Sequence, residues 1–166
     1  MKERSRKNRL KGVLVLGFLV FISLSLYSYH PQDPSLNSVG LSLKVNNLCG
    51  FVGSSLADLL YQFFGLSSWW IVLGGFVLVY SLLFHPFREK FFSFESSAIF
   101  LLCLMSLASI FELHFSNIQF FDQEVSLGGA FGEMTVSLLK PLLHTVGTAV
   151  VLWSAFLIVL ISYGQC

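Results

Sequence analysis

The stretch Asn47–Gly65, NLCGFVGSSLADLLYQFFG, decides how the rest of the chain is organised. It opens with an N-cap candidate, Asn47, carries Gly50 and Gly53 three residues apart, and stops at a glycine. Between these points the apolar residues follow the spacing of one helix face: Val52, Leu56, Leu59, Leu60 and Phe63. The pattern predicts a short amphipathic helix over about residues 48–64.

The sequence around this helix is far more apolar than that of an ordinary globular domain, since 55% of its 166 residues are hydrophobic and 11% are charged. It contains four largely uncharged runs of the length that crosses a bilayer as a helix. We therefore predict an all-α, polytopic membrane protein whose membrane domain covers residues 13–163. Its four transmembrane helices are expected at about residues 13–29, 66–84, 96–114 and 147–163.

Basic residues are unevenly distributed and predict the orientation. Six of the ten precede the first span: Lys2, Arg4, Arg6, Lys7, Arg9 and Lys11. Arg88 and Lys90 lie between the second and third spans, whereas only Lys44 and Lys140 lie in the other two connecting regions. Because cytoplasmic loops carry an excess of lysine and arginine, residues 1–12 are expected to be a cytoplasmic tail and residues 164–166 a short cytoplasmic end. The tail is expected to set topology and contact anionic lipid, with DNA binding as the alternative.

A second glycine-flanked helix is expected over about residues 129–144, where Gly128, Gly129 and Gly132 precede the fourth span. Each half of the chain is then predicted to contain, in order, a span, an outer connector, an amphipathic helix and a second span. The halves share one orientation, which predicts a parallel internal repeat. The two amphipathic helices are expected on the outer face, either interfacial or re-entrant.

Two interpretations of the repeated glycines remain open. Small residues at spacings of three and four allow close helix contact in lipid, or else they loosen the turn where the chain re-enters the membrane. Pro141 is expected to kink or end the second amphipathic helix, because proline lacks a backbone donor and clashes with the preceding turn. Asp58 and Glu133 lie on the polar sides of the two helices and are expected to face water or headgroups.

Several segments together resemble the N-terminal four-span membrane domain of the FtsK/SpoIIIE DNA translocases, particularly its gammaproteobacterial form. They are YHPQDPS at 29–35, NLCGFVG at 47–53, LAD at 56–58, FG at 64–65, GGAFG at 128–132 and LKPLLH at 139–144. The order and spacing of these segments within four spans carry the resemblance. The residues assigned to the family motif and to helix packing are Asp33, Pro34, Ser35, Asn47, Gly50, Gly53, Ala57, Asp58, Gly65, Gly128, Gly129, Gly132, Pro141 and His144.

The resemblance implies a septal membrane anchor that couples cell division to chromosome segregation, self-association as a hexamer, and contacts with other division proteins. The family's motor carries a P-loop, G-x-x-x-x-G-K-[ST], and the sequence holds no Gly-Lys-Ser/Thr. It therefore looks like the anchor alone. We expect no enzyme activity and no catalytic, cofactor or metal residues in this chain. ATP, magnesium and DNA would be bound only by the absent motor.

A small channel or transporter is the alternative function, because parallel repeats and intramembrane glycines also suit a pore. No span carries a charge in its central stretch to mark a pathway, which argues against it. A membrane enzyme would need a constellation of reactive residues. Glu112 and His114 are two residues apart, on opposite sides of a helix, and cannot share a metal ion.

Overall fold

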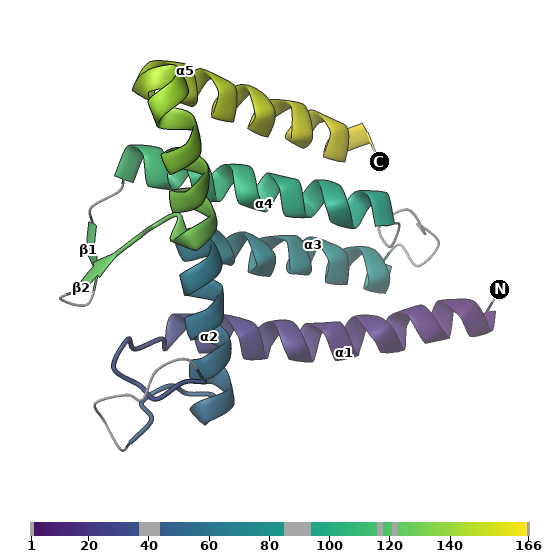
Figure 1. Cartoon of the computed structure of the whole chain (residues 1–166). Coiled ribbons are helices and arrows are strands. Elements are labelled where there is room, and N and C mark those ends of the chain that lie inside the picture. Colours follow the sequence, from purple (N-terminus) through teal and green to yellow (C-terminus); the bar gives the residue numbers. More distant parts are fainter. Residues whose placement is uncertain (1, 37–43, 85–93, 116–117, 121–122, 166) are drawn as a thin grey trace. The chain divides into compact units, whose positions relative to one another are not determined.

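The computed structural model describes residues 2–36, 44–84, 94–115, 118–120 and 123–165, and these residues are almost entirely helical (Figure 1). The helices, in chain order, are α1 (Lys2–Tyr27), α2 (Gly50–Phe64), a short 3-10 helix η1 (Gly65–Ser68), α3 (Trp69–Phe84), α4 (Phe94–Phe115) and α5 (Gly129–Gln165).

Four helical segments are long and apolar enough to cross a membrane: Arg9–Tyr27, Gly50–Phe84, Ser97–Phe115 and Gly129–Ser162. Their surfaces expose large apolar side chains, such as Leu14 at 75% and Val146 at 77%. Water would make this exposure costly, whereas lipid tails solvate it. The prediction of a helical, four-span membrane domain is confirmed.

Helix α1 begins at Lys2, so the basic tail and the first span form one continuous helix (Figure 1). The tail is rich in lysine and arginine, which are good helix formers, and proline is absent from it. Lys7, Arg9 and Lys11 are exposed on this helix. The helix therefore extends beyond the apolar part that lies in the bilayer.

The helical fold also includes one short hairpin, which leaves the predicted all-α class unchanged. Two short strands, β1 (Ile118–Phe120) and β2 (Gln123–Val125), pair antiparallel with Ile118 opposite Val125. They lie in the outer connector predicted between the third span and the second amphipathic helix. β-Branched and aromatic residues in this segment favour extended backbone, and the region is too polar to continue the preceding span.

The helices group into two compact units. The first comprises Met1–Asp58 and Trp69–Ser93, and in it α1 packs beside α3. The contact is close where glycines face leucines: a Cβ on Gly12 would lie 2.9 Å from Leu83 Cδ2, and one on Gly75 would overlap the side chain of Leu19. Small residues thus bring two spans together, as expected where no hydrophobic effect drives association.

The second unit comprises Leu59–Ser68 and Phe94–Cys166, with α4 packed on α5. Its buried apolar residues include Leu104, Leu107, Ala108, Leu152 and Phe156. Helix α5 changes direction part-way along its length (Figure 1).

The change of direction occurs at His144, whose φ of 54° and ψ of 178° are non-helical. The prediction that the helix would kink or end at Pro141 is therefore wrong in position, since Pro141 lies inside the helix. A proline removes only one donor and is tolerated where the neighbouring turn can adjust. The break falls where the chain must turn from the amphipathic segment into the last span.

Candidate functional site

Asn47 joins the end of α1 to the start of α2. Its side-chain amide donates to the carbonyl oxygens of Ser25 at 2.9 Å and Ser28 at 3.2 Å. Its Oδ1 accepts a hydrogen bond from the Cys49 backbone N–H at 3.0 Å. Asn47 therefore gives the Cys49 N–H group an acceptor just before α2, as an N-cap residue does. It also donates to two carbonyl groups at the end of α1.

Asp33 holds the connector between α1 and α2. Its carboxylate is 2% exposed and accepts backbone N–H groups of Asn46 at 3.0 Å and Asn47 at 2.8 Å. The Asn46 side-chain amide donates to it as well, at 3.0 Å. The carbonyl of Pro34 accepts a 2.9 Å hydrogen bond from Ser54 Oγ on α2. The Asp-Pro-Ser triplet thus attaches the connector to α2.

Asp58 is buried rather than facing water or headgroups, so that prediction is wrong. It is 8% exposed and accepts hydrogen bonds from Tyr29 Oη at 3.2 Å and Ser35 Oγ at 2.6 Å. The connector folds over the helix and supplies both hydroxyls. Its buried neighbours on α2 are small or polar: Gly53, Ser54, Ser55 and Ala57, the last fully buried.

The opposite side of α2 exposes large apolar residues, including Val52 at 66% and Phe63 at 48%. The helix therefore packs through its small and polar face and presents apolar side chains outward. This is the reverse of the arrangement in a water-soluble protein, and it is stable where the surroundings are lipid. On α5, Met134, Leu138 and Leu142 are likewise exposed, as is Glu133, in agreement with its predicted position.

Glu112 holds the corresponding turn of the second unit. The residue is 9% exposed, and its Oε2 accepts hydrogen bonds from Ser126 Oγ at 2.6 Å and the Gly128 backbone N–H at 3.3 Å. From the sequence, Glu112 is assigned no role, because it and His114 cannot share a metal ion. One feature of the sequence could have identified it: Glu112 is a carboxylate at the end of an otherwise apolar span.

The motif glycines fall into two groups, which correspond to the two predicted roles: close helix packing and formation of a turn. A Cβ on Gly132 would lie 2.6 Å from the Ala108 carbonyl oxygen, and one on Gly53 would lie 2.9 Å from Ser25 Oγ. Gly128 is similarly enclosed by α4. Three others have positive φ, which favours glycine: Gly50 at 64°, Gly65 at 55° and Gly129 at 61°.

The two copies of the repeat share backbone conformations at corresponding positions, even where the residue types differ. Gly50 and Gly129 begin the two amphipathic helices with positive φ, and Gly65 ends the first with positive φ. The residue at the same separation in the second copy is His144, which is exposed and has a φ of 54°. With ψ near 180°, His144 lies close to a region that is essentially restricted to glycine and costs about 1–3 kcal/mol.

The His144→Gly variant should be more stable than the parent chain. We expect the free energy of unfolding to rise by about 1 kcal/mol, because glycine relieves the strained backbone while losing somewhat more entropy on folding. Thermal unfolding in detergent, followed by helical circular dichroism, measures the shift. His114→Gly is the control, since it places a glycine inside α4 and should lower stability by a similar amount. An unfolding temperature unchanged or lowered by His144→Gly would contradict the strain assignment.

The other predicted residues have simpler surroundings. Pro141 is exposed at the margin of a pocket that is described below. Lys2, Arg4 and Arg6 belong to α1, and their side chains lie outside the described part of the structure. Among the described residues, no group of three or more His, Cys, Asp or Glu side chains could hold a metal ion.

Four membrane-spanning segments and two glycine-flanked helices define a multi-pass membrane domain. Residues 4–166 match the family model described as the 4TM region of DNA translocase FtsK/SpoIIIE, and the chain belongs to this family. The resemblance read from the sequence is confirmed.

Curated relatives agree with this assignment. The chain is 34% identical to a DNA translocase FtsK of Rickettsia prowazekii over 125 residues, which are 75% of the chain and 16% of the relative. It is 27% identical to a DNA translocase FtsK of Vibrio vulnificus over 169 residues, covering 93% of the chain and 16% of the relative. The chain thus spans about a sixth of the length of these relatives. No solved structure shows a significant match.

Proposed function

We propose that this membrane-anchor domain targets a DNA translocase to the division septum and couples cell division to chromosome segregation. The observation that carries the proposal is the family match, which covers residues 4–166 and therefore all four spans. The names of the relatives supply the motor's activity, DNA translocation. In this proposal the motor binds ATP, magnesium and DNA, while the four spans bind lipid and need no cofactor or catalytic residue.

The anchor must resist the force that a motor exerts while it moves DNA. Apolar surface on all four spans opposes extraction from the bilayer, at about 25 cal/mol for each Å² that would enter water. Asp33, Asn47 and Asp58 fasten the outer connector to α1 and α2 through buried and partly buried hydrogen bonds. These contacts stiffen the outer face, which is the surface that we propose binds other division proteins.

Orientation follows from the basic residues. Six lysines and arginines belong to the start of α1, and those with described side chains, Lys7, Arg9 and Lys11, are exposed. We propose that both chain ends lie in the cytoplasm and that this segment contacts anionic lipid headgroups. Self-association, as a hexamer by analogy with the family, would then place several such segments around one motor.

A green fluorescent protein fused after Cys166 tests location and orientation together, because this protein becomes fluorescent in the cytoplasm but not after export through the general secretion pathway. We expect fluorescence in the membrane, with a midcell intensity in constricting cells that exceeds the roughly twofold excess over the side wall that two apposed membranes alone produce, because septal enrichment adds to it. An unrelated four-span protein with the same fusion provides the twofold baseline.

Two results would count against the proposal. Dark but intact fusion protein would reverse the orientation. Midcell intensity no greater than that of the unrelated four-span protein would remove septal targeting while leaving the membrane-anchor assignment in place.

A further inference from the structure

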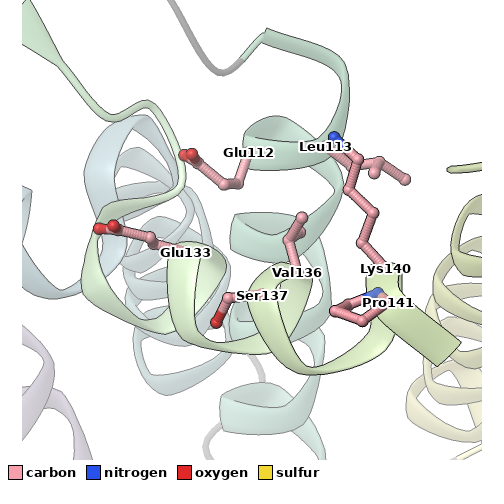
Figure 2. A pocket seen from close by; sticks show the side chains of 7 residues that line it. All are labelled: Glu112, Leu113, Glu133, Val136, Ser137, Lys140 and Pro141. Atoms are coloured by element: carbon pink, nitrogen blue, oxygen red, sulfur yellow. The ribbon is translucent and has the colours of Figure 1, made fainter. Parts of the chain in front are cut away.

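A pocket of about 410 Å³ lies in the second unit, where the outer end of α4 meets the first part of α5. Helix α4 contributes Glu112 and Leu113, and α5 contributes Glu133, Val136, Ser137, Lys140 and Pro141 (Figure 2). The volume falls in the range of small-molecule sites, about 300–1,000 Å³. Because Glu112 is close to the end of a membrane span, the pocket lies at the boundary between lipid and water.

Charges of both signs line this pocket without neutralising one another. Glu112 uses Oε2 to hold the turn before α5, and its Oε1 has no hydrogen-bond partner within the described ranges. Glu133 and Lys140 are exposed, and neither forms an ion pair with another described residue. Two carboxylates and one ammonium group are therefore available to a ligand.

The charges are also separated within the pocket. Figure 2 shows the Glu112 and Glu133 carboxylates pointing to the same side, whereas the end of the Lys140 side chain lies beside Leu113. Along the axis of α5, Glu133 and Lys140 are two turns apart, which is about 10 Å. The pocket thus has an acidic end and a basic end.

We propose that this pocket binds the phosphoethanolamine headgroup of a membrane lipid. The primary ammonium of that headgroup has three N–H donors, which match the oxygens of Glu112 and Glu133. Its phosphate carries the negative charge that Lys140 needs. A purely anionic headgroup would leave the carboxylates unpaired, and a neutral sugar headgroup would leave the charges at both ends of the pocket unpaired.

The apolar surroundings favour a lipid over a free zwitterion. Met134, Leu138 and Leu142 are 62%, 61% and 79% exposed on the same part of α5. Acyl chains attached to a headgroup in the pocket could cover these side chains, and each buried methylene adds about 0.8 kcal/mol. A choline headgroup has the same charges, but its quaternary nitrogen has no N–H to donate to the carboxylates.

Native mass spectrometry of the full chain in detergent tests the proposal directly, by counting lipid adducts after addition of one lipid at a time. With phosphatidylethanolamine we expect one saturable adduct, bound about tenfold more tightly than phosphatidylcholine or phosphatidylglycerol, equivalent to about 1.4 kcal/mol. Glu133→Gln should remove most of this preference, because it removes a carboxylate that accepts the ammonium N–H groups. Lys140→Gln should weaken the binding of all three lipids, because each carries the phosphate that Lys140 pairs with. Lys11→Gln, which removes the same charge as Lys140→Gln far along the chain from the pocket, should keep both the preference and the affinity.

Both pocket variants change exposed side chains, so unaltered thermal unfolding is the check that they remain folded. Equal binding of the three lipids, an unchanged preference in Glu133→Gln, or an unchanged affinity in Lys140→Gln would overturn the site. Soluble phosphoethanolamine that competes as strongly as the lipid would overturn its assignment to a membrane lipid. None of these results depends on septal targeting, so failure here and failure of the proposed function are distinguishable.

Discussion

Replacing Gly65 by alanine should destabilise the protein more than the same replacement at any of the other motif glycines. The residue has a φ of 55°, and a Cβ there would overlap the carbonyl oxygen of Leu127. That oxygen already accepts a 2.8 Å hydrogen bond from the Leu66 backbone N–H. The methyl group can therefore be accommodated only if two backbone segments separate. We expect a loss of about 3 kcal/mol or more in the free energy of unfolding, from backbone strain together with the broken contact.

Denaturation by increasing sodium dodecyl sulfate, with helical circular dichroism as the readout, measures this loss. Gly17→Ala is the matched control, because no atom lies within 4 Å of a Cβ built at Gly17 and its φ is not positive. The control should be neutral or gain up to about 1 kcal/mol, since alanine is the better helix former. Equal effects of the two substitutions would show that the turn at Gly65 tolerates a side chain.

Removing the carboxylate of Asp33 should have a comparably large effect. In Asp33→Ala, the backbone N–H groups of Asn46 and Asn47 lose their acceptor in a site that is largely closed to water. A buried donor left unsatisfied costs about 1–3 kcal/mol, so we expect a total loss of about 3 kcal/mol. The connector should also become accessible to protease in reconstituted vesicles.

The neighbouring substitution Gln32→Ala controls for the Asp33 experiment, because Gln32 is exposed. It should change stability by less than about 0.5 kcal/mol and leave protease resistance intact. Asp33→Asn should fall between the two, since an amide keeps one oxygen acceptor. If Asp33→Ala were as stable and as protease-resistant as Gln32→Ala, the connector would be held by other contacts.

Local signals in the sequence predicted the elements well. Asn47 has the residue type of an N-cap, and its Oδ1 accepts the Cys49 backbone N–H in the structure. The helix that follows ends at Phe64, immediately before the glycine expected to stop it. Glycine, asparagine and apolar runs act on their immediate neighbourhood, and so their effects can be read without knowledge of the fold.

Burial of polar residues was harder to predict. Asp58 lies on the polar side of an amphipathic helix, and the expectation that this side meets water assumes a protein surrounded by water. In the structure the polar side meets Tyr29 and Ser35 from the connector. Helical periodicity identifies two faces but does not state which one packs, because lipid reverses the usual preference.

The break in α5 illustrates a different limit. Proline was the obvious breaker, yet the backbone departs from helical geometry at His144, a residue type with no strong preference for that conformation. Comparison with the first copy locates it, because Gly65 has the same sign of φ at the corresponding position. Glu112 was missed for a related reason: its hydroxyl donor, Ser126, comes from the far side of the intervening connector.

The continuity of α1 has a mechanical consequence. The helix has 26 residues and is about 39 Å long, whereas the hydrocarbon core of a bilayer is about 30 Å thick. Its first turns therefore continue beyond the hydrocarbon as ordered helix, and any tilt of the first span also moves the basic tail. Inserting a single residue between the basic tail and the first span would rotate the tail by about 100° about the helix axis, so the helix fixes both the direction in which the tail's side chains point and their height above the bilayer.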